Sequence, residues 1–322
     1  MCQYCNALIK AIDAYLVKAD NDLTEALDDA GFTKPKETVK NIASLEDNIT
    51  EALEEETAYF RRKAKKSVDL KAFKDAWPEV IEGDNISKTL AKIFAEDFKA
   101  NIPGLAAAYI KQIDPALTVS TVTARTTAWA TEWSEKLGEL MKLETHSEIE
   151  KLLTDTLKDG KSVADFTQAL IDGGIRSERY RARSAALTEM LRVHSVAQQE
   201  ALTQNPAVES KEWVHTGSYK NVPRENHEAM NGVIVPKDEP FVLEGADGET
   251  YYPMYPRDPS LPPGESINCH CIHRGIVNAD ILGLSLEERK RLQQEAIDTD
   301  DDEWEKELDA QNKARAGIED EE

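Results

Sequence analysis

Apolar residues recur every three or four positions along most of residues 1–205, with polar residues between them. This spacing places the apolar side chains on one face of a helix. Each stripe is too narrow to be buried alone, so every helix needs a neighbour that covers it. The clearest stripes are Leu8, Ile12, Leu16, Ala19, Leu23 and Leu27; Ile42, Leu45, Ile49 and Leu53; Ile86, Leu90, Ile93 and Phe94; and Trp129, Trp133, Leu137 and Met141.

Residues that interrupt helices separate these stripes, namely Pro35, Pro78, Pro103-Gly104, Pro115 and Gly160. We interpret each of them as a helix boundary. Ser162 followed by Asp165 has the spacing of a capped helix start, ahead of Phe166 and Leu170. The first half of the chain is therefore expected to be all-helical.

A longer helix is predicted from about Ser177 through RYRARSAALTEMLRVHSVAQQEAL. Glu189 and Arg192 are three residues apart, which makes them neighbours on the helix surface. His194 lies in the apolar stripe of this helix. A core histidine with a hydrogen-bonded ring is the favoured interpretation, and a metal-binding or catalytic histidine is the alternative.

After Pro206 the pattern changes to short apolar segments bounded by glycine and proline. Gly232–Val235 and Phe241–Leu243 are predicted to be short strands. Ala246–Glu249 is predicted to be a hairpin turn, because Asp-Gly accepts positive φ. Helical pattern returns later, where Ser285 and Glu288 have the spacing of a capping box.

Together these patterns predict an α+β fold in three parts. An elongated all-helical region covers residues 1–175, a small loop-rich α+β domain covers 176–278, and a helical acidic tail covers 279–322. The end of the tail is expected to be solvated, with a partner-binding segment as the alternative. The small domain is near the size at which a hydrophobic core alone is marginal and a metal cross-link becomes useful.

Charge restricts the partners that such a chain can bind. The 322 residues include 39 Lys and Arg against 61 Asp and Glu, which gives a net charge of −22. Most of the surface therefore repels nucleic acid, and contact with DNA requires local basic patches. Arg61–Lys66 and Arg176–Arg183 are such patches, although a solvated helix face is the favoured interpretation of Arg61–Lys66. A basic partner surface or a protein partner fits the charge better.

The compartment in which the chain is made sets the chemistry of its four cysteines. The N-terminus lacks the features of a signal peptide, and no apolar run approaches ~18 residues. We therefore expect a soluble protein that is made in a cytosol and has no membrane contact. In that reducing compartment the cysteines are expected to be thiols or metal ligands rather than disulfides.

The segment PPGESINCHCIHRG holds two of the four cysteines and two of the six histidines. Cys269 and Cys271 are two residues apart, so both thiols project from one face of an extended segment. Two thiolates on one face form half of a tetrahedral zinc site. The candidates for the other ligands are His227, His215, His270 and His273, of which His273 is in phase with the cysteines and His270 faces the opposite side.

A single C-x-C pattern leaves other interpretations open. The two cysteines can be reduced core residues, a disulfide formed after release from the cell, or a nucleophile with a histidine partner. The nucleophile is disfavoured because neither a helix N-terminus nor an oxyanion framework is apparent. Cys2 and Cys5 lie at i, i+3 on a predicted helix, and we interpret them as a buried or incidental pair, with inter-subunit metal binding as the alternative.

The order of several short motifs resembles the C-terminal domain of the phage Mu F-like minor head proteins, the phage head morphogenesis family. The resemblance covers residues 181–274, about a third of the chain. The residue between the cysteines is often Arg in that family and is His270 here. The matching residues are Thr188-Glu189, Trp213, Arg224 with His227, Gly232, Pro263-Gly264-Glu265, and Asn268-Cys269 with Cys271.

This resemblance implies a minor capsid protein of a tailed phage or prophage, made in the bacterial host cytoplasm. It implies a location at the portal vertex and in the head interior, and a role in procapsid assembly and in DNA packaging or ejection. The implied partners are the portal protein and the capsid or scaffold proteins. Packaged DNA is a further expected partner, through the two basic patches.

The first hypothesis is a structural, non-enzymatic head protein. In it, His227 and the two cysteines share a structural zinc ion, with His273 as a further ligand. Arg224 pairs with Glu189 or Glu265 and so ties the helix to the loop. A second hypothesis is a metal-dependent nuclease-like enzyme, because RENH, Asn231 and C-x-C resemble metal-finger nucleases in outline. A delivered toxin is disfavoured, since the tail is too short for a catalytic domain.

Overall fold

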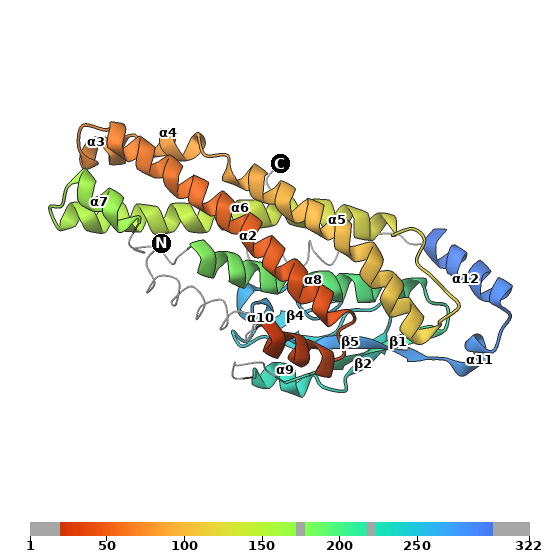
Figure 1. Cartoon of the computed structure of the whole chain (residues 1–322). Helices are drawn as coiled ribbons and strands as arrows, with labels where there is room; N and C mark the ends of the chain where they lie inside the picture. The colour runs from red at the N-terminus through yellow and green to blue at the C-terminus, as the bar shows by residue number, and fades with distance from the viewer. Residues whose placement is uncertain (1–19, 172–177, 218–222, 299–322) are drawn as a thin grey trace, which may run out of the picture. The chain divides into compact units, whose positions relative to one another are not determined.

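The computed structural model describes residues 20–171, 178–217 and 223–298, and helices dominate it (Figure 1). The chain divides into two compact units, and each is discontinuous in sequence. Unit one comprises residues 1–41, 101–127 and 187–322, and unit two comprises residues 42–100 and 128–186. Residues 1–175 thus contribute to both units, and the predicted three-part division stays a prediction. No helix in the described residues is long and apolar enough to cross a membrane.

The elements follow the helical and then mixed pattern of the sequence, which confirms the α+β fold. A helix over residues 20–29 precedes them and buries Leu23 and Leu27. The elements are α2 (Pro35–Lys66), α3 (Leu70–Asp75), α4 (Trp77–Glu82), α5 (Ile86–Ile113), α6 (Ala124–Lys158), α7 (Val163–Ala169), α8 (Glu178–Gln204), β1 (Val208–Val214), α9 (Glu225–Ala229), β2 (Ile234–Pro236), β3 (Leu243–Glu244), β4 (Thr250–Tyr251), α10 (Pro263–Ser266), β5 (Ile272–Val277), α11 (Ala279–Leu282) and α12 (Leu286–Asp298).

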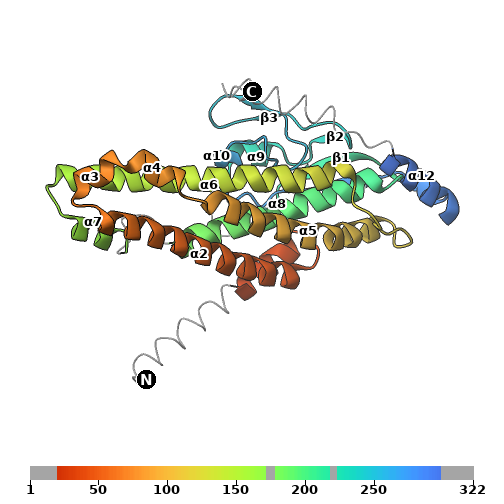
Figure 2. The same ribbon diagram turned by 90° about the horizontal axis from the view of Figure 1, so that it is seen from above.

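Unit two is built from helices whose apolar stripes cover one another. Figure 2 shows that the parts of α2, α5 and α6 that belong to unit two lie side by side. An aromatic core fills one part of the unit, where Phe73 packs on Trp77 and Phe166. Ser162 caps α7 through a capping box with Asp165, as the sequence predicts.

The helix boundary predicted at Pro103-Gly104 is wrong, because α5 continues through it from Ile86 to Ile113. Proline removes one backbone hydrogen bond and clashes with the preceding turn. Burial on both sides of the proline outweighs this cost: Phe98 and Ile102 before it and Tyr109 and Ile110 after it are buried.

Unit one holds the small sheet, in which the order is β2-β1-β5 and both pairs are antiparallel (Figure 1). A register shift between Val208 and Ser210 breaks the alternation of β1, so Val208, Lys211 and Trp213 are all buried. Strand β2 agrees with the predicted strand, whereas β5 was not predicted. The β3–β4 hairpin turns at Gly248, whose φ of +86° fits the predicted Asp-Gly turn.

The tail returns to helix in α11 and α12. The N–H of Glu288 donates to Oγ of Ser285, which is one of the two bonds of the predicted capping box. Gln293 of α12 donates to the carbonyl of Thr118, so this helix is joined to the rest of unit one. The expected acidic end of the tail and the Cys2 and Cys5 pair lie outside the described residues.

Candidate functional site

Three of the predicted ligands meet in the core of unit one. The ring of His227 presents Nδ1 to both thiols, 3.5 Å from Sγ of Cys269 and 3.7 Å from Sγ of Cys271. All three residues are buried, and their ligand atoms lie within 4.8 Å of one another. His215 lies beside them, with Nδ1 3.5 Å from Sγ of Cys271. We call His215, His227, Cys269 and Cys271 the Cys–His cluster.

Local backbone geometry brings these residues together. Asn268 takes a φ of +58°, which turns the chain sharply between α10 and the cysteines. Asparagine tolerates this left-handed conformation better than most residues do, so the position of Asn268 in the motif has a conformational reason. Gly232 has a φ of +84° and donates its N–H to the carbonyl of Trp213, in the turn that follows α9.

Glu265 fixes the orientation of the His227 ring. Oε2 of Glu265 lies 2.9 Å from Nε2 of His227, and both side chains are buried. The same carboxylate accepts hydrogen bonds from the side chain of Asn226 and from the backbone N–H of Ala246. Because the carboxylate accepts from Nε2, Nδ1 is left as the ring atom that faces the sulfurs.

The thiols are also chemically biased. The neighbouring Cys271 thiol and the His227 ring hold the pKa of the Cys269 thiol well below its usual range, although burial opposes this shift. Arg257, whose Nη1 lies 3.9 Å from Sγ of Cys269, acts in the same direction. The cluster therefore favours one thiolate in an otherwise buried setting.

Arg257 was missed by the sequence analysis, although its side chain is fully buried beside the cluster. Its Nη1 donates to the carbonyls of Cys269 and Cys271, and its Nη2 donates to Oγ of Ser195 on α8. The residue takes a φ of +67°. Its place in the proline-rich stretch YPRDPSLPP suggested only a loop, since no pattern there indicates that an arginine turns inward.

A buried pair on α8 supports Arg257. Glu189 and Arg192 form a two-bond ion pair, and Arg192 also donates to the backbone carbonyl of Arg257. The prediction that Glu189 and Arg192 are neighbours on the helix is confirmed, and both side chains are buried. The adjacent Thr188 is buried too, and its hydroxyl has no hydrogen-bond partner in the described residues.

The proposed pairing of Arg224 with Glu189 or Glu265 is wrong. Arg224 donates to the carbonyl of Ile267 at 2.6 Å in an exposed position. The carboxylate of Glu189 already accepts a hydrogen bond from Arg192, and the carboxylate of Glu265 is already paired with the His227 ring. Both carboxylates therefore have partners other than Arg224. The link between helix and loop exists, but it passes through Arg192 and Arg257.

His273 is not part of the Cys–His cluster. It faces Trp213 in the register of β1 and β5, and its ring stacks on Tyr255 with centroids 6.0 Å apart. Its two ring nitrogens have no hydrogen-bond partner in the described residues, and burial lowers its pKa well below the usual range. The in-phase argument failed because regular strand geometry begins only at Ile272, after both cysteines.

The remaining motif residues lie around the cluster. Trp213 is buried and packs edge-on against His227, with centroids 5.8 Å apart. Gly264 lies in the four-residue helix α10 beside Glu265, and a Cβ placed on it would meet nothing within 4 Å. Space does not explain why glycine occupies that position.

His194 is a hydrogen-bonded core histidine, as favoured from the sequence. Nε2 lies 2.7 Å from the Thr38 hydroxyl and Nδ1 lies 2.9 Å from the Tyr109 hydroxyl. Burial, with a smaller effect from Arg257, lowers the pKa of His194 to about 3. Its ring is therefore neutral at physiological pH and serves packing rather than proton transfer.

Unit two contains a second buried group that sequence reasoning missed. Glu56, Asp84 and His146 come from three separate segments, and their ligand atoms lie within 4.8 Å of one another. Nε2 of His146 lies 2.8 Å from a carboxylate oxygen of Asp84. Burial, reinforced by the charge of Asp84, raises the pKa of Glu56 to about 8. In the sequence Glu56 is one of several consecutive glutamates, so nothing distinguishes it there.

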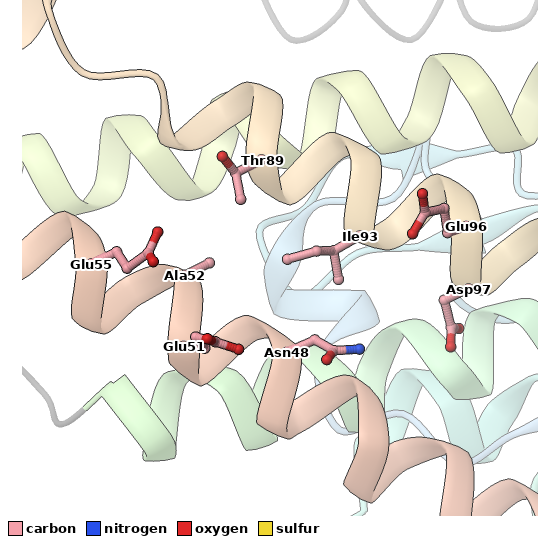
Figure 3. Close-up of a pocket in the computed structure, with 8 residues that line it drawn as sticks. All are labelled: Asn48, Glu51, Ala52, Glu55, Thr89, Ile93, Glu96 and Asp97. Carbon is pink, nitrogen blue, oxygen red and sulfur yellow. The ribbon is translucent and has the colours of Figure 1, made fainter.

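Charged groups on the surface of unit two form one acidic cleft, which repels DNA, and two basic patches, which attract it. A cleft of about 330 Å³ lies between α2 and α5, and its lining includes the carboxylates of Glu51, Glu55, Glu96 and Asp97 (Figure 3). In the second basic patch, Arg179 and Arg183 both pair with Glu46. The first patch, Arg61–Lys66, is mostly exposed and contributes three lysines to the last turn of α2.

By fold and site, this chain is an α+β protein in which buried Cys, His and Arg side chains join a small sheet to a long helix. A family model described as "Phage Mu protein F like protein" matches residues 147–274. An uncharacterized protein of Bacillus subtilis (strain 168), YqbB, is 34% identical over 307 residues, which cover 90% of this chain and 97% of the relative. No solved structure matches. The chain belongs to the phage Mu F-like family, and this membership supports a protein of phage head morphogenesis.

Proposed function

We propose that this protein is a minor capsid protein of a tailed phage or prophage. It acts at the portal vertex and in the procapsid interior, during head assembly and DNA packaging or ejection. The family match over residues 147–274 carries the proposal, because that range contains the whole Cys–His cluster and the arginines that support it. The proposed partners are the portal protein and the capsid or scaffold proteins.

The geometry supports a structural role for the small domain rather than catalysis. A general base needs a ring nitrogen that can reach substrate. In His227, Nδ1 faces the two thiols and Nε2 faces Glu265, and the whole side chain is buried. The nuclease-like alternative depends on His227 and gains no support from this arrangement.

Contact with packaged DNA, where it occurs, is proposed to use Arg61–Lys66. Its exposed side chains, Arg62 and the three lysines, can neutralise phosphates. Arg179 and Arg183 are less suited, because carboxylates of Glu46 and Asp47 already pair with this patch. The acidic cleft between α2 and α5 repels DNA for the same electrostatic reason.

The proposal is tested in a phage or prophage that encodes this chain. Mass spectrometry of purified procapsids and virions should detect the protein, and deletion of its gene should reduce filled heads until the wild-type gene is restored. In co-expression, the chain should co-elute with the portal protein, whereas an unrelated protein of similar negative charge should not. Absence from both particles, together with no portal complex, would contradict the proposal.

The enzyme alternative has its own test. Purified protein is incubated with DNA and RNA in the presence of Mg²⁺, Mn²⁺ or Zn²⁺, beside the variant His227→Gln. Metal-dependent cleavage that disappears in a variant of unchanged circular dichroism would overturn the structural assignment. We expect no cleavage by either protein.

A further inference from the structure

We propose that His215, His227, Cys269 and Cys271 form a closed, tetrahedral zinc site. The site fastens the end of β1, helix α9 and the segment before β5 to one another within unit one. It goes beyond the head-assembly role and does not depend on it.

Distances between the ligand atoms fit such a tetrahedron. Zinc lies about 2.3 Å from sulfur and about 2.0–2.1 Å from nitrogen, so tetrahedral angles place sulfur and nitrogen about 3.5 Å apart. Three of the four sulfur–nitrogen separations in the cluster are 3.5, 3.5 and 3.7 Å. A conventional hydrogen bond does not require this convergence of two rings on two thiols.

His227 is oriented as a metal-ligating histidine commonly is. A ligating histidine usually gives its other ring N–H to a carboxylate, which fixes the tautomer. His227 does so with Glu265 at 2.9 Å. His215 presents Nδ1 to Cys271, and a carboxylate oxygen of Glu228 lies 4.0 Å from its Nε2, which is beyond hydrogen-bond distance.

His215 is held next to the cysteine segment by two contacts of its own loop. Its backbone N–H donates to the side chain of Asn231, and the Thr216 hydroxyl donates to the carbonyl of His270 at 2.8 Å. The other three ligand atoms already lie within 4.8 Å of one another. Zinc binding requires the His215 ring to move closer to those atoms, because His215 lies outside the group whose ligand atoms are all within 4.8 Å of one another.

Charge balance favours the site in a buried setting. When Zn²⁺ binds, the protons that the cluster still holds on its ligand atoms leave to solvent, and two thiolates with two neutral imidazoles leave the centre with no net charge. Arg257 stabilises the sulfur side, because its Nη1 donates to the carbonyls of both cysteines and lies 3.9 Å from Sγ of Cys269. A neutral centre avoids most of the cost of burying charge.

The experiment measures metal content and coordination on the full chain, with Cys2→Ser and Cys5→Ser as the background so that thiolate signals report on the cluster alone. We expect about one zinc per chain. Cobalt exchanged for zinc should give the intense visible bands of a tetrahedral centre and the ultraviolet charge-transfer absorption of two thiolates. Absence of zinc, or a six-coordinate cobalt spectrum, would overturn the proposal.

Variants then assign the ligands. His215→Ala should weaken zinc binding by more than about 100-fold, and Glu265→Gln by about 10- to 100-fold, as for carboxylates that orient a ligating histidine. His270→Ala is the matched control, because it removes an imidazole between the same two cysteines without removing a ligand. Zinc loss from His270→Ala as large as that from His215→Ala would contradict the assignment. His227→Ala should also lose zinc. If that variant does not fold, the cobalt spectrum of the Cys2→Ser, Cys5→Ser protein still shows whether the intact cluster is a tetrahedral centre.

Discussion

Nη1 of Arg257 lies 2.8 Å from the backbone carbonyl oxygen of Cys269, inside the core of unit one. The same guanidinium reaches a second carbonyl at Cys271 and the hydroxyl of Ser195. One side chain thus joins α8 to the segment that carries both thiols. A planar fork with several donors suits this task, and a lysine ammonium does not reproduce it.

Arg257→Lys should therefore lower the free energy of unfolding by about 3–5 kcal/mol, because buried carbonyls lose partners while a buried charge is kept. Urea unfolding monitored by circular dichroism provides the measurement. Arg224→Lys is the matched control: it also changes an arginine that donates to a backbone carbonyl, but at an exposed position. An equal loss in the free energy of unfolding in both variants would show that the buried hydrogen bonds of Arg257 contribute no more than the one of Arg224.

Sequence patterns predicted what depends on local physics. Apolar periodicity gave the helices, the capping pattern gave the start of α7, and Asp-Gly gave the β3–β4 turn. The helix boundary at Pro103 failed because tertiary burial overrides a local signal. Strand β5 went unpredicted, because its polar residues and Gly275 hide the extended pattern in IHRGIV.

The site was predictable only in part, for a related reason. Cys269, Cys271 and His227 are rare residues in a recognisable order, so they could be named from the sequence. The roles of Arg257 and Arg192 depend on which of 39 basic side chains turns inward, and that is decided by packing between segments far apart in the chain. The same holds for Glu56, which only the fold places beside Asp84.

His194 should make unit one sensitive to acid. Its pKa of about 3 in the folded protein is below the ordinary value near 6.5, so its contribution to stability is complete above pH 6.5 and is lost as pH falls toward 3. Between pH 7 and pH 5 this amounts to about 2 kcal/mol. His194→Gln should be less stable at pH 7 but should lose less on acidification. Urea titrations at the two pH values check this, and parallel losses in both proteins would refute it.

Glu56 should make unit two less stable as the pH rises, which is opposite to the acid effect expected for His194. Its pKa is raised to about 8 by burial and by Asp84, so its contribution to stability is complete below about pH 4.5 and is lost as pH rises through 8. Glu56→Gln keeps the shape of the neutral acid. We expect this variant to match the parent at pH 4 and to melt at a higher temperature at pH 9. Glu54→Gln, at an exposed position on the same helix, should show no such gain.

Close packing of two helices leaves no room for a side chain at Gly138 in unit two. A Cβ at this position of α6 would lie 2.4 Å from the backbone carbonyl oxygen of Ser87 and 3.1 Å from the backbone nitrogen of Ala91. Backbone atoms cannot move aside as a flexible side chain can, so Gly138→Ala should force the helices apart. We expect a loss of about 1–3 kcal/mol in the free energy of unfolding, despite the better helix propensity of alanine.

Gly264→Ala is the natural comparison for that loss. Gly264 also lies in a helix, and its added Cβ would meet nothing within 4 Å. Alanine there restricts the unfolded chain without a clash, so a gain of about 0.4–1 kcal/mol is expected. Thermal unfolding of the two variants beside the parent separates the cases. A stabilised Gly138→Ala protein would mean that α5 and α6 do not approach as closely as the contact at Ser87 requires.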